Sequence, residues 1–390
     1  MSLNNRGTNN KKNLFIFAGE LSGDLHGSRL ITAIREIHPA WHMEGVCGPS
    51  MRSCGVSGPL QMEDFEVMGF TDVLLNFPKL YRQFYFLRDH IIRNRFDCVI
   101  LIDYPGFNLK LASALRKSGY AGKIIQYISP TVWAWGKHRI ETMSATLDLL
   151  LTIYPFEKPH FEKSSLQVEY VGNPLREYLS MHKYRDEWKN EVKINARANN
   201  KKLIGLFPGS RKSEIKRHLP LMVQAAVQMH AAFPETIFGI SQAGLEPIVL
   251  PKNVPDIFFV VPKQYTYELM RDSTAAMAKS GTVTLELALH HCPAAVVYHL
   301  STLNRIYAKH VLKVSLPHYC IVNILAKDHI FPELIERKCS ADSLCSYVKQ
   351  LYRMSPERDK SLAGCQKITD LLNIENPSTM AAEAVAKLLC

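Results

Sequence analysis

Two segments of this chain, one in each half, share a pattern in which an apolar strand ends in a turn of small and charged residues and continues as a helix. The first strand is Leu14–Ala18, and the turn after it, Gly19–Asp24, reads Gly-Glu-Leu-Ser-Gly-Asp. The second strand is Leu203–Phe207, and its turn, Pro208–Arg211, reads Pro-Gly-Ser-Arg. Helix N-termini after buried parallel strands present free backbone N–H groups, which bind anions. The repeat predicts two similar halves that hold a phosphorylated ligand between them.

Further apolar runs predict the remaining strands. They lack the alternation of a half-exposed strand, which indicates parallel strands buried on both faces. The predicted strands are Cys98–Ile102, Lys123–Ile128, Leu149–Ile153 and Val168–Val171 in the first half, and Leu203–Phe207, Ile237–Ile240, Phe258–Val261, Ala275–Ala278 and Ala294–Tyr298 in the second. Helical patterns separate them and also cover Ser340–Tyr352 and Pro377–Leu389. We therefore expect an α/β protein with two Rossmann-like, doubly wound domains facing a cleft, and C-terminal helices.

The length of 390 residues exceeds what one core usually holds, so two or three domains are expected. The predicted boundaries are a disordered tail over 1–12, a first domain over 13–175, a polar linker over 176–202, a second domain over 203–350, and helices over 351–390.

The net charge of +11 indicates an anionic partner: nucleic acid, a lipid surface or a phosphorylated substrate. Arg6, Lys11 and Lys12 precede a short apolar run that soon meets Glu20, so we expect a cytosolic protein without a signal peptide. No run approaches the roughly 20 apolar residues of a membrane span, so membrane contact would be peripheral. The nine cysteines form no C-x-x-C pair and are interpreted as buried thiols in a reducing compartment.

Asp103 follows the strand Cys98–Ile102 directly. Ligands of open α/β sheets bind outside the carboxyl ends of the strands, so a carboxylate there is a candidate catalytic group. The alternative is that Asp103 only caps the following helix or turn.

The turn Ser280-Gly281-Thr282 also follows an apolar strand and opens a helix. Its N–H groups and hydroxyls are placed to hold a diphosphate, and Glu286, one turn later, to accept hydrogen bonds from ribose hydroxyls. A capped helix with a solvated glutamate is the alternative. Arg211 is either a bidentate phosphate ligand or a solvent-facing charge.

Several common motifs are missing: D-x-D, H-E-x-x-H, the P-loop and a strict G-x-G-x-x-G. A metal-dependent diphosphate site is therefore disfavoured, and neither a metal nor another cofactor is predicted. His290-His291-Cys292 are adjacent on a predicted helix and point in different directions, which does not suit a metal site.

The stretch Phe70–Arg95 mixes apolar, aromatic and basic side chains. Such a face suits an anionic bilayer or an acyl chain, but an amphipathic helix packed on the core has the same pattern. The candidate acyl or membrane surface comprises Val73, Leu74, Leu75, Phe77, Lys79, Leu80, Tyr81 and Arg82.

Four sequence motifs together make the chain resemble the lipid-A-disaccharide synthase family over about residues 13 to 385. They are Gly19–Asp24, Ser129–Trp135, Pro208–Arg211 with Glu214, and Ser280–Thr282 with Glu286. The resemblance implies a metal-independent, inverting glycosyltransferase of the two-domain GT-B type, at the cytoplasmic face of the inner membrane of Gram-negative bacteria. Such enzymes join UDP-2,3-diacylglucosamine to 2,3-diacylglucosamine 1-phosphate and release UDP and a β-1,6-linked disaccharide.

The resemblance also implies site residues. It makes Asp103 the essential aspartate, and the first domain the one that binds acceptor and lipid. The implied UDP-binding residues are Gly209, Ser210, Arg211, Ser280, Gly281, Thr282, Glu286 and Asn323, and the implied positioning residues are Glu20, Ser22 and Asp24. The C-terminal helices are expected to return to the first domain or to be exchanged in a homodimer.

Two positions depart from the family pattern. Ile321-Val322 stand where a Leu-Pro pair usually precedes Asn323, so the register there is open. Gly106 replaces a second aspartate, which favours Asp103 as the base. The alternatives are another UDP-sugar enzyme of this fold, such as a peptidoglycan-precursor glycosyltransferase or an epimerase, and a non-enzymatic anion-binding or RNA-binding protein. His26 either positions the acceptor or only packs.

Overall fold

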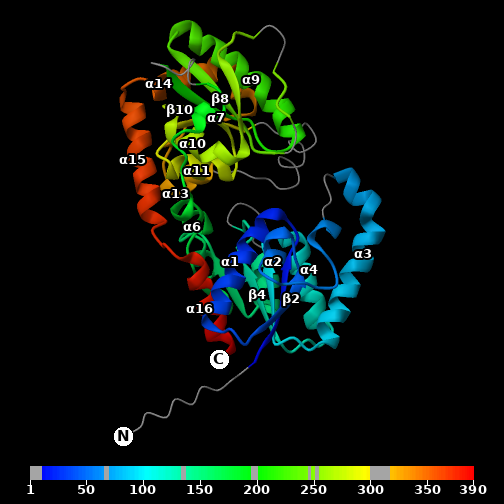
Figure 1. The fold of residues 1–390 in the computed structure, drawn as a ribbon. Helices are drawn as coiled ribbons and strands as arrows, with labels where there is room; N and C mark the ends of the chain where they lie inside the picture. Colours follow the sequence, from blue (N-terminus) through cyan, green and yellow to red (C-terminus); the bar gives the residue numbers. More distant parts are fainter. Residues whose placement is uncertain are drawn as a thin grey trace. The chain divides into compact units, whose positions relative to one another are not determined.

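The chain forms two compact units in the computed structural model (Figure 1). The structure describes residues 11–65, 70–132, 138–194, 201–244, 247–250, 254–298 and 317–390, and the side chains of 70–77, 138 and 337 are not among those described. The first unit comprises Met1–Met181 and Leu372–Cys390, and the second comprises His182–Leu371. The tryptophan phrase at Trp133–Trp135 lies outside the described residues.

The first unit contains a six-stranded parallel sheet in the order β2-β1-β3-β4-β5-β6. Its strands are β1 (Asn13–Ala18), β2 (His42–Val46), β3 (Cys98–Ile102), β4 (Lys123–Tyr127), β5 (Leu149–Thr152) and β6 (Gln167–Tyr170). Its helices are α1 (Leu21–Ile37), α2 (Pro49–Ser53), α3 (Phe70–Arg93), α4 (Pro105–Lys117), α5 (His138–Thr146), α6 (Pro174–Met181) and α16 (Pro377–Leu389), with 3-10 turns η1 (Met62–Asp64) and η2 (Lys158–Phe161).

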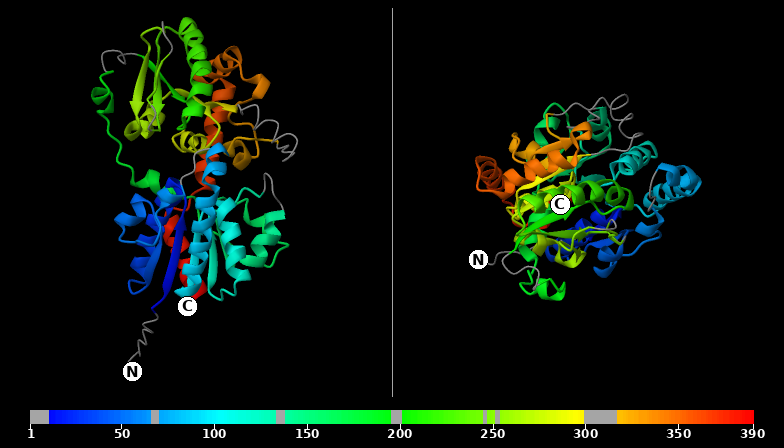
Figure 2. Two further views of the ribbon diagram at one scale, coloured as in Figure 1. Left: turned by 90° about the vertical axis from the view of Figure 1, so that its right-hand side faces the viewer. Right: turned by 90° about the horizontal axis from the view of Figure 1, so that it is seen from above.

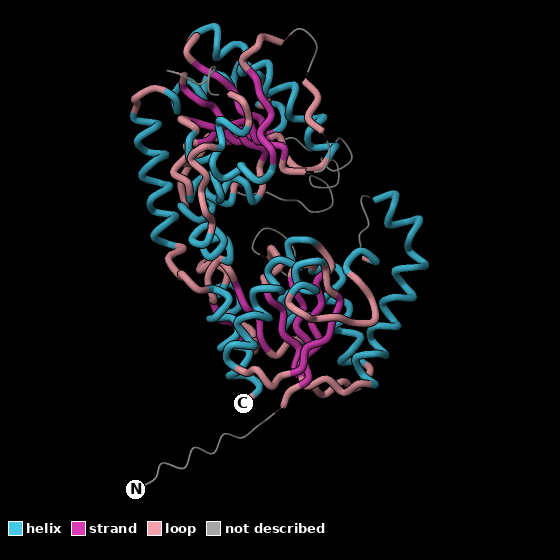
Figure 3. Tube along the Cα trace, in the orientation of Figure 1, coloured by secondary structure: helices cyan, strands magenta, loops and turns pink. Residues whose placement is uncertain are grey.

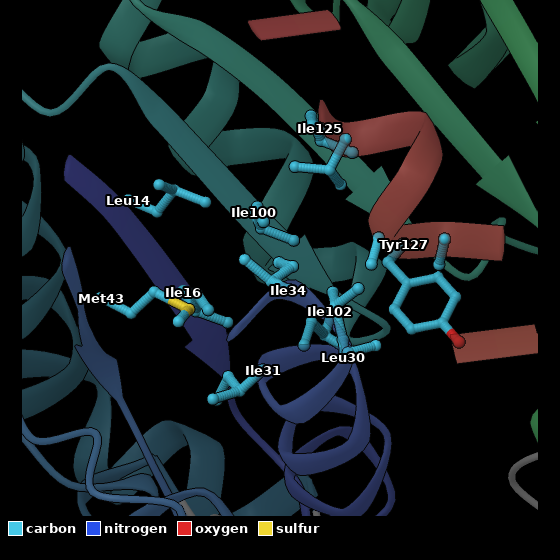
Figure 4. Close-up of a cluster of buried hydrophobic side chains, with 14 of the residues drawn as sticks. Leu14, Ile16, Leu30, Ile31, Ile34, Met43, Ile100, Ile102, Ile125 and Tyr127 are labelled. Carbon is cyan, nitrogen blue, oxygen red and sulfur yellow. The ribbon is translucent and has the colours of Figure 1, made fainter. Parts of the chain in front are cut away.

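Both faces of this sheet are buried, which explains why its strands read as continuous apolar runs. Leu14 and Ile16 of β1 enter one hydrophobic cluster with α1 and α16, shown in Figure 4. Phe15 and Phe17 enter the other cluster, with α3, α4 and α5. Helix α16 therefore packs beside α1, although the two are separated by most of the chain (Figure 1).

The second unit contains another six-stranded parallel sheet, in the order β12-β11-β10-β7-β8-β9. Its strands are β7 (Lys202–Phe207), β8 (Thr236–Gln242), β9 (Phe258–Pro262), β10 (Ala275–Lys279), β11 (Ala294–Tyr298) and β12 (Glu333–Ile335). Its helices are α7 (Trp188–Glu191), α9 (Lys212–Ala232), α10 (Thr266–Asp272), α11 (Thr282–Leu289), α13 (Ile321–Ala326), α14 (Ala341–Tyr352) and α15 (Pro356–Leu371), with 3-10 turns η3 (Lys263–Tyr265) and η4 (Glu336–Lys338). Helices surround the strands in each unit (Figures 2 and 3).

The predicted α/β class with two doubly wound sheets is confirmed. Each of the ten predicted strands is present, with its ends within two residues of the prediction. Strand β4 stops at Tyr127 because Ile128 has a left-handed backbone, with φ of 72°. The sequence patterns missed β2 and β12, which lie at sheet edges and carry polar residues. Helices α15 and α16 lie within the helical region expected over 351–390. Among the described residues, no helix is long and apolar enough to cross a bilayer.

Candidate functional site

Each sheet has one position where the strand order reverses, and the turns singled out by sequence lie there. In open parallel sheets ligands bind at that switch point, outside the carboxyl ends of the strands. In the first unit the switch point lies between β1 and β3, so the turn after β1 and Asp103 after β3 share one edge. In the second unit it lies between β7 and β10, which brings Pro208–Arg211 and Ser280–Thr282 to one edge.

Asp103 lies in a strained backbone at the end of β3. Asp103 and Tyr104 both have left-handed backbones, with φ of 48° and 44°. Such conformations cost about 1–3 kcal/mol each and persist where the surroundings hold them. Burial raises the pKa of Asp103, which makes its carboxylate a stronger proton acceptor than an exposed aspartate.

Two buried amides hold this strained backbone. Gln126 of β4 donates from Nε2 to the carbonyl oxygens of Asp103 (2.9 Å), Tyr127 (3.3 Å) and Ile128 (3.1 Å). Asn108 of α4 donates from Nδ2 to the carbonyl oxygen of Ile102 at 3.3 Å and to that of Asp103. Gln126 was not among the predicted site residues, although a glutamine inside an apolar strand run signals a buried polar role.

Replacing Gln126 by leucine is expected to destabilise the protein by about 1–3 kcal/mol, because three buried carbonyl groups lose a donor. Denaturant unfolding of both proteins measures this change. Gln167→Leu is the matched control, since Gln167 is an exposed strand residue bonded to Glu169, and about 0.5 kcal/mol or less is expected there. Equal effects of the two substitutions would argue that Gln126 does not support the turn.

The three positioning candidates in the first turn divide into two groups. Glu20 and Ser22 are exposed at the start of α1. Asp24 is fully buried, and its carboxylate accepts the backbone N–H groups of Gly48 (2.8 Å), Ser50 (2.7 Å) and Met51 (3.0 Å). Asp24 therefore holds the start of α2, and of the three positioning candidates Glu20 and Ser22 are the exposed ones.

His26, one turn into α1, hydrogen-bonds the hydroxyl of Tyr178 at 3.0 Å through Nδ1. Burial and the nearby Arg29 lower its pKa to about 4, so the ring is neutral at physiological pH. These contacts favour the packing role for His26.

An ion pair joins the two turns of the second unit. Glu214, in the first turn of α9, contacts the Lys279 ammonium at 2.9 Å, and Lys279 ends β10. The same carboxylate accepts the N–H groups of Ser210 (3.2 Å) and Arg211 (3.4 Å). Burial opposes ionisation of Glu214, but Lys279 and these N–H groups lower its pKa below the usual value. The contact with Lys279 was not predicted from sequence.

Gly209 is needed for this arrangement. Its backbone φ is +116°, and an added Cβ would lie 2.5 Å from the Glu214 carboxylate oxygen Oε2. Arg211 is the N-cap residue of α9, with an exposed side chain. The turn therefore presents a cation beside a helix N-terminus, which suits a phosphate group.

The second turn opens α11 as predicted. Ser280 is buried, Gly281 is the N-cap residue, and Thr282 is exposed. Glu286 follows one turn later, half-buried, and burial raises its pKa to about 7.

Asn323 is fully buried in α13, and both ends of its amide are engaged. It donates to the carbonyl oxygen of Phe331 (2.8 Å) and to Glu333 (2.9 Å). It accepts the N–H groups of Ile330 (3.0 Å) and Phe331 (2.9 Å). This geometry gives Asn323 a structural role before β12, and its contact with UDP stays a prediction.

Helix α3 packs one side against the core and exposes aromatic and basic side chains on the other, so both interpretations of its sequence apply to it in part. Leu87 and Ile91 are buried in the core. The candidate surface residues Lys79, Tyr81 and Arg82 are exposed, while Leu80 packs partly against the core; the side chains of Val73, Leu74, Leu75 and Phe77 lie outside the described residues. The exposed side of α3 therefore carries aromatic and basic groups together.

No group of His, Cys, Asp and Glu suited to hold a metal ion occurs in the described part of the chain. His290 hydrogen-bonds the Tyr184 hydroxyl at 2.9 Å and the carbonyl oxygen of Glu286 at 2.7 Å.

Known proteins resemble this chain over most of its length. A family model described as lipid-A-disaccharide synthetase matches residues 14–387. The lipid-A-disaccharide synthase of Chlamydia pneumoniae is 37% identical over 330 residues, which are 83% of this chain and 54% of the relative. The one from Geobacter sulfurreducens is 32% identical, with 98% of each chain covered. The chain thus spans about half the length of the chlamydial relative and nearly all of the Geobacter one.

Among solved structures, the UDP-GlcNAc 2-epimerase from Neisseria meningitidis bound to UDP-GlcNAc has a TM-score of 0.61. The two are 13% identical, with 96% of this chain and 100% of that chain covered. At this identity the likeness concerns the fold alone.

Proposed function

Because the chain belongs to the lipid-A-disaccharide synthetase family, we propose that it is a glycosyltransferase that condenses UDP-2,3-diacylglucosamine with 2,3-diacylglucosamine 1-phosphate. The products are the β-1,6-linked disaccharide 1-phosphate and UDP. The proposal is supported by the positions of these residues: Asp103 follows a strand at one switch point, and the turns Pro208–Arg211 and Ser280–Thr282 lie together at the other.

In the proposed reaction the acceptor's 6-hydroxyl attacks the anomeric carbon of the donor sugar and inverts it. Asp103 takes the hydroxyl proton as the C–O bond forms. Its raised pKa supports this role, because a buried carboxylate holds the proton more firmly than an exposed one. Glu20 and Ser22 position the sugars beside it.

UDP leaves with growing negative charge, which the second unit compensates. Arg211 pairs with the diphosphate, and the N–H groups of Gly209, Gly281 and Thr282 and the hydroxyls of Ser210 and Ser280 donate to it. Glu286 accepts hydrogen bonds from the ribose hydroxyls. The chain's own cations supply this compensation in the proposal, so no metal or other cofactor is invoked.

The setting of the reaction follows from its substrates. Both substrates carry acyl chains, so the protein must bind them at a membrane surface, and we propose that it does so through the exposed side of α3. The family resemblance implies that this surface is the cytoplasmic face of the inner membrane. We also propose that two copies of the chain form a homodimer. Residues 13–175 are assigned to acceptor and lipid, and residues 203–350 to the UDP-sugar.

Mass spectrometry of the products tests the proposal. Incubation with both diacylated substrates should yield the disaccharide 1-phosphate and UDP, whereas plain UDP-glucosamine should be a poor donor. An epimerised UDP-sugar without disaccharide would assign the chain to the epimerase alternative.

A pH experiment tests Glu286. With the pKa near 7, the carboxyl is mostly neutral at pH 5.5 and ionised at pH 8, and the ionised form is the stronger acceptor for ribose hydroxyls. The affinity for UDP-glucose, whose phosphates do not titrate in this range, should rise about tenfold between these pH values. Glu286→Gln should bind with an affinity that changes little with pH in the same calorimetric titration. If the affinity of Glu286→Gln for UDP-glucose rises with pH as much as that of the wild type, Glu286 does not bind the ribose.

A further inference from the structure

The first unit has a groove along the solvent side of α4, between α3 and α5. Its volume is about 750 Å³. It begins at Pro105 and Gly106, directly after Asp103 and Tyr104, and continues along α4 to Ser118. Helices α3 and α5 form its two walls, and α3 lies beside α4 in Figure 1. One end of the groove therefore opens at the switch point of the first sheet.

The charges along the groove have one sign. Arg88, Lys110, Lys117 and Arg139 line it, and the described lining residues include no carboxylate. Arg88 is partly neutralised by Asp89 of the same helix, at 2.6 Å, and stacks over the Tyr85 ring at 4.6 Å. A groove lined by several basic side chains and no acidic one has a positive potential that attracts an anion.

Two of the cations lie nearest the switch point. Lys110 follows Gly106 by four residues, so it lies on the same face of α4, one turn further. Arg139 belongs to the first turn of α5, which begins after the carboxyl end of β4. A phosphate bound by this pair would lie in the part of the groove that begins at Pro105, two residues after Asp103.

We propose that this groove binds the phosphate monoester of the acceptor glycolipid, with Lys110 and Arg139 as the main phosphate ligands. The inference rests on the proposed function, which requires a phosphorylated acceptor at the carboxyl end of β3. Charge complementarity selects the phosphate. Tyr85 of α3 lines the groove, and the exposed Tyr81 lies against it with ring centroids 4.6 Å apart, which provides apolar surface for the acyl chains of the same molecule.

Equilibrium binding in detergent micelles tests this assignment without depending on catalysis. The probes are 2,3-diacylglucosamine 1-phosphate and the same lipid without the phosphate. Wild-type protein should bind the phosphorylated lipid at least about tenfold more tightly, and Lys110→Ala with Arg139→Ala should remove that preference. Lys163→Ala, an exposed lysine of the same unit outside the groove, should keep it.

Two results would overturn the proposal. One is a preference for the phosphorylated lipid that survives the double substitution; if the same variant no longer binds phosphatidylglycerol vesicles, the groove is a contact for bilayer headgroups instead. The other is an equal loss of affinity for both lipids. Failure of the proposed function appears separately, as absence of disaccharide in the mass spectra.

Discussion

Asp103→Asn is expected to lower kcat by about 10²- to 10⁴-fold and to leave the affinity for UDP within about twofold of wild type. The amide has the size of the carboxylate but cannot take the proton of the attacking hydroxyl. Asparagine also tolerates the left-handed backbone at φ 48°, where alanine would add strain. The backbone carbonyl of Asp103 keeps its bonds to Gln126 and Asn108, so the turn should persist.

Single-turnover rates of disaccharide formation and calorimetric titration of UDP measure the two effects. Asp97→Asn is the matched control, because Asp97 lies at the opposite end of β3 and accepts the N–H of Asn13 at 2.7 Å. Full turnover in Asp103→Asn would refute its role as the base. A loss of UDP affinity as large as the loss of rate would instead indicate a disturbed fold.

Arg211→Ala is expected to weaken UDP binding about 10- to 100-fold, because a charge-assisted hydrogen bond to phosphate contributes about 1.5–3 kcal/mol. Arg211 is the N-cap residue of α9 and exposed at the end of β7, so its removal should leave the core intact. The loss should be smaller for uridine, which lacks the phosphates.

Lys216→Ala, one turn further along α9 and also exposed, removes the same charge without touching the turn and should bind UDP normally. Calorimetric titrations of both variants with UDP and uridine give the comparison. Unchanged UDP affinity in Arg211→Ala would exclude the residue from the site, and equal losses for UDP and uridine would point to a role other than phosphate binding.

The strands and the turns after them could be read from the sequence. Parallel strands buried on both faces leave continuous apolar runs, and Phe15 and Phe17 alternate with Leu14 and Ile16 between two cores without breaking the run. A small-residue turn after such a run is a local feature, as Gly209 at φ +116° shows. The positions of Asp103 and Ser280 at strand ends follow from these local patterns alone.

The partners of individual side chains needed the tertiary structure. Glu20 and Asp24 belong to one phrase, yet only Asp24 is buried, because the start of α2 packs against it. A glutamine in an apolar run signals burial, but the sequence does not show which groups Gln126 or Lys279 contacts. Their partners, Asp103 and Glu214, lie on segments that only the strand order brings near.

The strands, and the points where each strand ends and a helix begins, follow from the amino-acid pattern, because burial and turn conformation act on neighbouring residues. The pairing of β3 with β1 and of β10 with β7 does not follow from that pattern. That choice depends on the packing of whole helices across the sheet, and it is what gathers the separate turns at two edges.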